Sequence, residues 1–146
     1  HEYTGKGLSD LFCQSVSHHY QQQHLSLPSL ITPVPLHWRS QWNRGFNQSA
    51  CFSFALSQHM GIAHFDHSRR VKGTKPQKAL SKKERIKSLR NSFLVTKPLN
   101  GKSIVIVDDV MTTGATVNSL ATELKRAGAG SISVWVLART PNYRFR

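Results

Sequence analysis

The feature that most constrains the fold is a run of four β-branched residues, Ile104–Val107, followed at once by the acids Asp108 and Asp109. β-Branched side chains suit a strand that is buried on both faces of a parallel sheet. In open α/β sheets, ligands bind beyond the carboxyl ends of the strands. We therefore predict a central strand over Ser103–Val107, with a pair of carboxylates at its ligand-binding end.

The segment after the acids is typical of an anion-binding turn. Residues Thr112–Thr116 have the sequence Thr-Thr-Gly-Ala-Thr and lead into a helix that we predict over Thr116–Ala127. Small residues let backbone N–H groups converge on an anion, and a helix N-terminus adds partial positive charge. Carboxylates for sugar hydroxyls beside a phosphate cradle predict a sugar phosphate as the ligand. The alternative is a capped helix without a ligand, but adjacent acids repel each other unless something compensates them.

The first half of the chain shows helical and extended patterns. An apolar stripe predicts an N-terminal helix, and the run from Leu30 to Val34 predicts a strand that ends near Pro35. Asn47 is placed to cap a further helix, which Gly61 closes. The stripe of the first helix consists of Leu8, Leu11, Phe12, Val16 and Tyr20, and that of the second consists of Phe52, Ala55, Leu56 and Met60.

The middle of the chain is strongly basic. Ten Lys and Arg residues and a single acid lie between Arg69 and Arg90. Gly73, Pro76 and the lack of apolar periodicity predict a mobile loop over Arg69–Leu80, and Ser81 opens a capping box. Strands are predicted over Phe93–Val95 and Ile132–Ala138. Strands that alternate with helices indicate an α/β domain with a mostly parallel sheet.

Composition limits the partners and the compartment. The 20 Lys+Arg against 7 Asp+Glu give a net charge of +13, which favours phosphates, diphosphates or nucleic acid as partners, unless the charge serves solubility alone. Cys13 and Cys51 form no CxxC pair, so neither a zinc site nor a disulfide scaffold is predicted. No apolar stretch is long enough to span a membrane, and no signal peptide is evident, so we expect a cytoplasmic protein.

The segment Ile104–Thr116 resembles the motif with which phosphoribosyltransferases bind 5-phosphoribosyl-1-pyrophosphate (PRPP). The resemblance implies a type I phosphoribosyltransferase fold, in which Asp108 and Asp109 meet the ribose 2′- and 3′-hydroxyls. It also implies that Mg²⁺ accompanies PRPP, held largely by the diphosphate and ribose oxygens, so no residue is assigned as a metal ligand. The residues that would wrap the 5′-phosphate are Thr112, Thr113, Gly114, Ala115 and Thr116.

Further blocks resemble the ComF/GntX group, whose members are associated with DNA uptake in competence and with gluconate utilisation. The chain departs from the group at Ser88 and Ser92. Full-length members often begin with a four-cysteine zinc module, so we expect residues 1–146 to be a single domain, the C-terminal part of a longer protein. The matching positions are Pro33–His37, Arg39, Arg44–Gln48, Arg70, Thr74, Gln77, Leu80, Arg85, Phe93 and Leu137–Thr140.

Basic residues outside the motif are candidates for the rest of such a ligand. Arg39 and Arg44 follow the first strand and are expected to bind the diphosphate, because arginine donates two parallel hydrogen bonds to phosphate oxygens. The alternative is that they are solvated surface charges. Arg69–Leu80 resembles the flexible hood that closes over PRPP, and closure excludes water. The hood residues expected to take part are Arg70, Lys72, Thr74, Gln77 and Arg85.

Two functions compete on this basis. The first is Mg²⁺-dependent transfer of phosphoribosyl from PRPP to an acceptor, with release of diphosphate. The second is a non-catalytic PRPP sensor whose basic surface binds single-stranded DNA or a partner protein. Arginines and aromatic residues around Trp38 and Trp42 allow the second function, although packing beneath the loop is the simpler role for both rings. The sequence identifies no acceptor, no general base and no oligomeric state.

Overall fold

The β-branched run lies at the centre of a four-stranded parallel sheet with the strand order β2-β1-β5-β6. The computed structural model describes residues 2–36, 47–71 and 92–140, and it confirms the expected α/β architecture. A separate antiparallel pair is formed by β3 and β4. The strands are β1 Leu30–Pro33, β2 Ala63–His64, β3 Ser68–Arg70, β4 Phe93–Val95, β5 Ser103–Met111 and β6 Ser131–Arg139.

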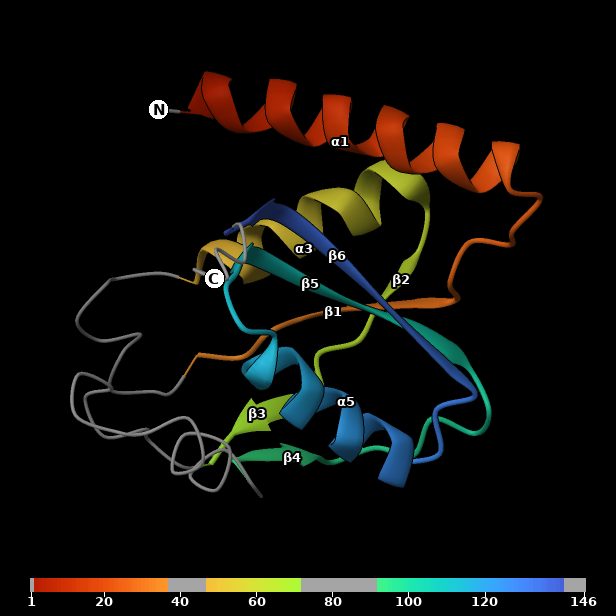
Figure 1. The fold of residues 1–146 in the computed structure, drawn as a ribbon, viewed down its shortest axis with the longest axis vertical. Helices are drawn as coiled ribbons and strands as arrows, with labels where there is room; N and C mark the ends of the chain where they lie inside the picture. Colours follow the sequence, from red (N-terminus) through yellow and green to blue (C-terminus); the bar gives the residue numbers. More distant parts are fainter. Residues whose placement is uncertain (1, 37–46, 72–91, 141–146) are drawn as a thin grey trace, which may run out of the picture.

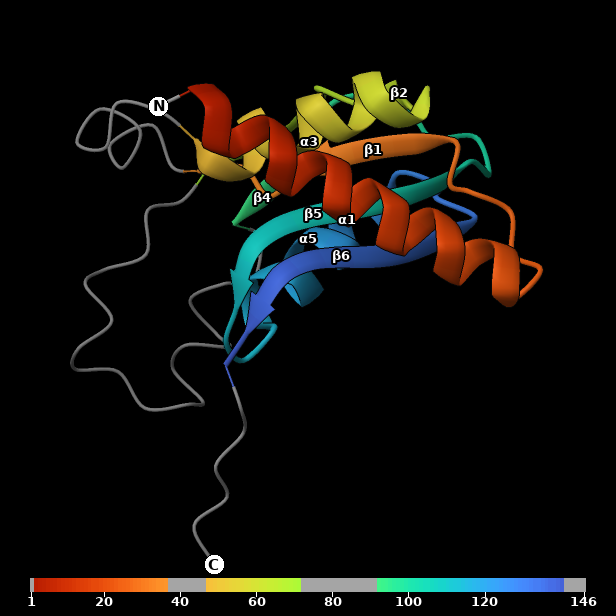
Figure 2. The same ribbon diagram turned by 90° about the horizontal axis from the view of Figure 1, so that it is seen from above.

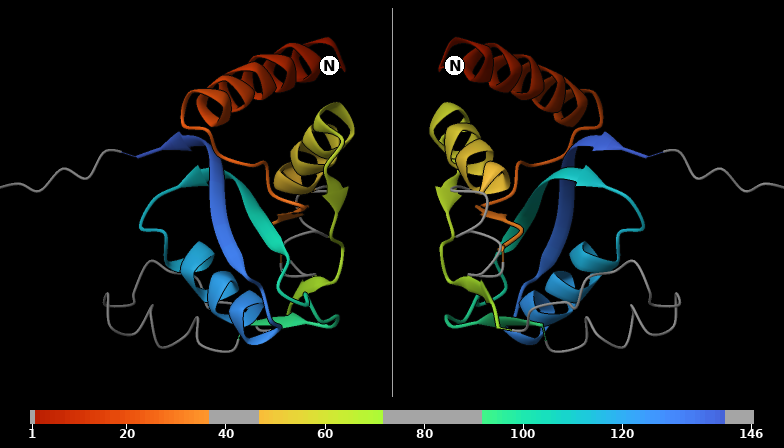
Figure 3. Two further views of the ribbon diagram at one scale, coloured as in Figure 1. Left: turned by 90° about the vertical axis from the view of Figure 1, so that its right-hand side faces the viewer. Right: turned by 90° about the vertical axis from the view of Figure 1, so that its left-hand side faces the viewer.

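Helices cover both faces of the main sheet (Figure 1, Figure 3). Helices α1 (Glu2–Gln22) and α3 (Gln48–Met60) lie on one face, and α5 (Ala115–Arg126) lies on the other together with β3 and β4. Viewed from above, α1 runs over β5 and β6 (Figure 2). Because each of α3 and α5 follows a strand of this parallel sheet, both helices begin at its carboxyl edge.

The central strand divides the core into two layers. Ile104 and Ile106 pack toward α5, and Val105 and Val107 pack toward α1 and α3. All four side chains are fully buried. This alternation follows from the two-residue period of a strand, and burial of each such side chain is worth about 1.5–3 kcal/mol. The prediction of a strand buried on both faces is therefore confirmed.

The apolar stripe of α1 differs from its prediction. Leu8 and Leu11 are 50% and 64% exposed, whereas Cys13 is buried. Val16 and Tyr20 pack against the core, and the Tyr20 hydroxyl accepts a hydrogen bond of 3.3 Å from Trp135 Nε1. At 100° per residue, the packed face centres between Val16 and Tyr20, and Leu11 falls on the opposite side of the helix. Assigning the two leucines to the packed face was wrong.

The segment predicted as a mobile loop begins with a strand. Arg69 and Arg70 belong to β3, where they pair with Leu94 and Phe93 of β4. The Arg70 guanidinium lies over the Phe93 ring, 5.6 Å from its centroid. A three-residue strand such as β4 needs a backbone partner, and β3 supplies one although its sequence has no apolar pattern. The loop prediction was therefore wrong at Arg69 and Arg70.

The turn before β5 fits closely against the turn before β6. Asn100-Gly101 forms the predicted turn, and Gly130 N donates to Lys102 O at 3.0 Å. A Cβ atom on Gly130 would lie 2.1 Å from the carbonyl oxygen of Gly101, so only glycine fits there. None of the helices in the described ranges is long and apolar enough to cross a membrane.

Candidate functional site

The two acids lie where the pairing between β1 and β5 ends. Pro33 opposite Val107 is the last pair of that ladder, and Val34 N donates to Val107 O at 3.0 Å. β5 does not stop at Val107 as predicted, because its ladder with β6 continues to Met111 opposite Arg139. Asp108 and Asp109 therefore belong to the strand, and they still lie at the carboxyl edge that the sequence predicts.

Each carboxylate is held by the protein through one oxygen. Asp108 Oδ1 accepts a hydrogen bond from Asp109 N, and Asp109 Oδ1 accepts one from Val110 N, both at 3.0 Å. The Ser49 hydroxyl lies 3.4 Å from both Oδ1 atoms, so its single proton is shared between them or donated to one at a time. Within the described ranges, the two backbone N–H groups and the Ser49 hydroxyl contact the Oδ1 atoms and not the Oδ2 atoms. The two carboxyl groups also share a side-chain hydrogen bond with each other.

Burial and the neighbouring Asp109 perturb the acidity of Asp108. Burial is the main cause that raises the pKa of Asp108 to about 6, and Asp109 raises it further, while the Ser49 hydroxyl acts in the opposite direction. An acid in this state gains from a ligand that donates hydrogen bonds to its charged form. Sugar hydroxyls are such donors.

The N-terminus of α3 faces the carboxylates through Ser49. Asn47 is the cap: its side-chain oxygen accepts from Ala50 N at 3.3 Å, and its Nδ2 donates to Val34 O at 3.2 Å. Asn47 thus joins the end of β1 to the first turn of the helix, as its predicted capping role requires. The partial positive charge of this helix end favours anions in the site.

The turn that leads into α5 presents a second helix N-terminus. Thr112 and Thr113 are exposed, and Gly114 has a φ of 73°, in the left-handed region that favours glycine. No side chain caps this helix end, and Ala115 N contacts Thr113 Oγ1 only at 3.4 Å. The helix begins at Ala115, one residue before the prediction. Apart from Ala115 N, the first-turn N–H groups of this helix are where an anion can bind.

Several predicted site residues lie outside the described residues. These include both predicted diphosphate ligands and most of the predicted hood: Arg39, Arg44, Lys72, Thr74, Gln77 and Arg85. Arg70 is described, and it lies on β3 with its guanidinium over a ring rather than in a loop. Burial lowers the pKa of Arg70 from its usual value. Its assignment to the hood loop is corrected accordingly.

Ser49 is the contact that the sequence does not predict. It lies two residues after the cap Asn47, in the first turn of a helix that begins at the carboxyl edge of the sheet. Side chains in such a turn point toward the ends of the strands. That position is the one signal in the sequence that could have identified Ser49.

The carboxylate edge is compatible with a cation that a ligand brings with it. Among the described residues, no group of three or more His, Cys, Asp and Glu side chains could hold a metal ion. Mg²⁺ commonly keeps several waters and takes substrate phosphates as ligands rather than a cage of side chains. The negative charge of Asp108 and Asp109 suits such a cation.

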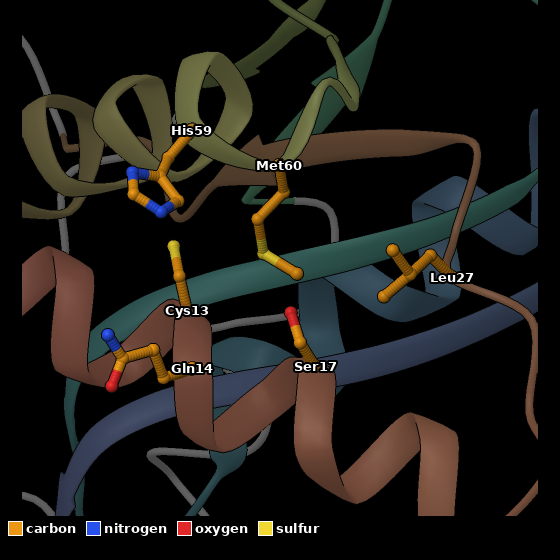
Figure 4. A pocket seen from close by; sticks show the side chains of 6 residues that line it. All are labelled: Cys13, Gln14, Ser17, Leu27, His59 and Met60. Carbon is orange, nitrogen blue, oxygen red and sulfur yellow. The ribbon is translucent and has the colours of Figure 1, made fainter.

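A separate cavity of about 290 Å³ lies between α1 and α3 (Figure 4). Its lining shares no residue with the predicted site. Cys13 points into it toward the His59 ring. Burial, followed by the charge of Asp10, raises the pKa of the Cys13 thiol, so this cysteine stays protonated and unreactive at neutral pH. The lining residues are Cys13, Gln14, Ser17, Leu27, His59 and Met60.

Comparison with known proteins matches this chain to one family model and to several named relatives. Residues 50–146 match the family model described as "Phosphoribosyl transferase domain". The chain is 41% identical over 134 residues to DNA utilization protein YhgH of Salmonella typhimurium, and 40% identical over 119 residues to Competence protein F of Haemophilus influenzae. These matches cover 91% and 79% of this chain, but only 59% and 52% of the two relatives.

The fold also matches solved structures. Purine phosphoribosyltransferase from Pyrococcus horikoshii Ot3 superposes with a TM-score of 0.57 at 21% identity, over 92% of this chain and 74% of that one. An identity this low carries the fold alone. The type I phosphoribosyltransferase fold expected from the sequence is confirmed.

Proposed function

This chain belongs to the phosphoribosyl transferase domain family, in the ComF group of competence and DNA utilization proteins, and from that premise we propose that its carboxyl-edge site binds PRPP. Asp108 and Asp109 would accept hydrogen bonds from the ribose 2′- and 3′-hydroxyls. The turn Thr112–Thr116 would hold the 5′-phosphate. Arg39 and Arg44, on the segment between β1 and α3, would bind the diphosphate.

One observation carries this proposal above the others. The carboxylates of Asp108 and Asp109 lie between the N-termini of α3 and α5, and Ser49 contacts only their Oδ1 atoms. The N-terminus of α5 has no side-chain cap. A neutral sugar carries no negative charge to interact with the partial positive charge of two helix N-termini, and a simple phosphate would be repelled by the carboxylates. A sugar that carries phosphate groups satisfies both kinds of group at once.

The proposed reaction is transfer of the phosphoribosyl group. An acceptor nucleophile bonds to the ribose C1 atom while the bond from C1 to the diphosphate oxygen breaks, and diphosphate leaves with the electron pair. Mg²⁺, when bound with PRPP, would neutralise charge on the departing diphosphate. The carboxylates would fix the ribose by its hydroxyls and would stabilise positive charge that develops on the sugar. A closed hood would exclude water from C1.

Calorimetry with PRPP and Mg²⁺ tests the binding step. We expect saturable binding to one site per chain, and phosphate should compete with it at millimolar concentration. Release of diphosphate across a panel of nucleobases tests the transfer step. Failure of PRPP to bind the folded protein at any concentration up to 1 mM, about the upper end of ordinary substrate affinities, would refute the proposal.

A second candidate function follows from the names of the relatives. The chain would act in DNA uptake or utilisation as a PRPP-responsive module that binds single-stranded DNA through its basic surface, with gluconate utilisation as a further role associated with the group. The net charge of +13 supports a polyanionic partner. Binding to single-stranded DNA should weaken with salt, with a log–log slope of about −0.7 per phosphate contacted. DNA binding without diphosphate release would favour this function over catalysis.

A further inference from the structure

Ser49 has an unusual set of contacts for a helical serine. Its side chain is buried, with 5% of the residue exposed, and its hydroxyl lies 3.4 Å from Oδ1 of both Asp108 and Asp109. Serine hydroxyls inside helices commonly donate to a carbonyl of the preceding turn. Ser53, one turn later, does so by donating to Ala50 O at 3.0 Å. Ser49 instead reaches across to the sheet.

The contacts of Ser49 divide the oxygens of each aspartate into two classes. Both Oδ1 atoms receive a backbone N–H at 3.0 Å and the shared Ser49 hydroxyl. Both Oδ2 atoms are left without these donors in the described part of the chain. A carboxylate can rotate about its Cβ–Cγ bond, and the backbone N–H together with the shared Ser49 proton restrains that rotation. The pair is therefore oriented before any ligand arrives.

We infer that Ser49 is a positioning residue that orients both carboxylates so that their Oδ2 atoms meet the two hydroxyls of a ribose diol. This inference rests on the proposed function for the identity of the ligand. The anchor is firm, because α3 carries Ser49 in its first turn and Asn47 ties that turn to the end of β1.

The test compares Ser49→Ala with Ser53→Ala. Ser53 is a matched control, since it lies on the same helix, is fully buried and contacts Ala50 O and His64 Nε2 rather than the aspartates. Ser49→Ala should weaken PRPP binding about tenfold, within the range for a hydrogen bond to a charged group. Ser53→Ala should leave PRPP affinity unchanged. Ser49→Thr, which keeps the hydroxyl, should restore most of the affinity.

A second readout distinguishes positioning from a loss of structure. Burial and Asp109 raise the pKa of Asp108, and the Ser49 hydroxyl opposes that rise. Within the described ranges, Asp109 is the charged group that acts on this carboxyl, and the residue opposite it on β6 is the apolar Val136. In Ser49→Ala the ¹³C carboxyl resonance of Asp108 should titrate at higher pH than in the wild type. Ser53→Ala should not move it.

The two proposals fail in different ways. If wild type binds no PRPP, the proposed function is refuted. The titration of Asp108 without ligand still tests whether Ser49 hydrogen-bonds to that carboxylate. If wild type binds PRPP and Ser49→Ala matches it in both affinity and carboxyl titration, the role of Ser49 is overturned and the proposed function stands. A tenfold loss that Ser53→Ala reproduces would also overturn it, because the effect would then belong to the helix.

Discussion

The two helices that begin at the carboxyl edge of the sheet start in opposite ways. The first turn of α3 is closed by Asn47, whose side chain accepts from Ala50 N and donates to Val34 O. The first turn of α5 follows Gly114, which offers no side-chain acceptor. A closed helix end needs nothing from outside, whereas an open one leaves its donors to water or to a ligand. The start of α3 is thus capped within the fold, whereas the start of α5 is the end at which we propose that the phosphate binds.

The strongest test of this comparison removes the acceptors that lie between the two helix ends. Asp108→Asn combined with Asp109→Asn should lower PRPP affinity at least about 100-fold, since two charged acceptors for ribose hydroxyls are lost. The free energy of unfolding should stay within about 1 kcal/mol of wild type or rise, because burial of a charge and like-charge repulsion are relieved. Calorimetry and urea unfolding measure both quantities. Unchanged affinity in the folded double variant would remove the ribose assignment.

The next test closes the open helix end. Gly114→Val should weaken PRPP binding about 30- to 100-fold, because a branched side chain would crowd the phosphate turn, and it should cost about 1–2 kcal/mol for a left-handed φ. Gly61→Val is the matched control. Gly61 closes α3 with a φ of 65° and has open space around its Cα, far along the helix from the site. It should lose similar stability and keep its PRPP affinity; equal losses of affinity in both variants would contradict the cradle.

A smaller effect is expected from opening the closed end. Asn47→Ala should lower the free energy of unfolding by about 1–2 kcal/mol, as for other lost N-caps, and should change PRPP affinity less than about threefold. Thr113→Ala removes only the 3.4 Å contact to Ala115 N in the exposed turn. That variant should stay within about 0.5 kcal/mol of wild type. If urea unfolding shows equal destabilisation by the two substitutions, the starts of α3 and α5 do not differ in how much side-chain capping stabilises them.

The smallest effect concerns pH. Burial and Asp109 raise the pKa of Asp108 from 3.8 to about 6, so the folded state binds a proton more readily than the unfolded state. Stability therefore falls as pH rises through this window, by about 1 kcal/mol once solvent screening is allowed for. Asp108→Asn should reduce the difference in unfolding free energy between pH 4 and pH 7. A variant with the same difference as wild type would show that another group is responsible.

The sequence predicted the elements whose local pattern and tertiary role agree. The four β-branched residues Ile104–Val107 predict a strand that is buried on both faces. Asn47 and Gly61 predict the two ends of α3, because both are residue types that cap helices. The carboxyl-edge position of Asp108 follows from the same reasoning, because a parallel strand has only one ligand-binding end. These inferences needed no knowledge of which segments meet.

The remainder depended on partners that are distant in sequence. β5 extends beyond its predicted end because β6 pairs with it as far as Met111. The sequence of one strand does not show how long its partner is. Arg69 belongs to a strand because Leu94 lies opposite it. Leu11 was assigned to the packed face although it lies on the opposite side of the helix from Val16 and Tyr20, because the sequence does not show which face of α1 meets the core. Ser49 contacts acids that lie 59 and 60 residues further along the chain.

The ladder between β1 and β5 has a consequence for the order in which the molecule is assembled. Ser29 and Ser103, which hydrogen-bond at the start of that ladder, are separated by 74 residues. Until Ser103–Met111 leaves the ribosome, β1 has only the two-residue strand β2 as a sheet partner. Long-range pairings of this kind form late, because closing so long a loop costs entropy before any contact compensates for it. One edge of β1 therefore stays unpaired until Ser103–Met111 is synthesised. That same segment contains Asp108 and Asp109 of the candidate site.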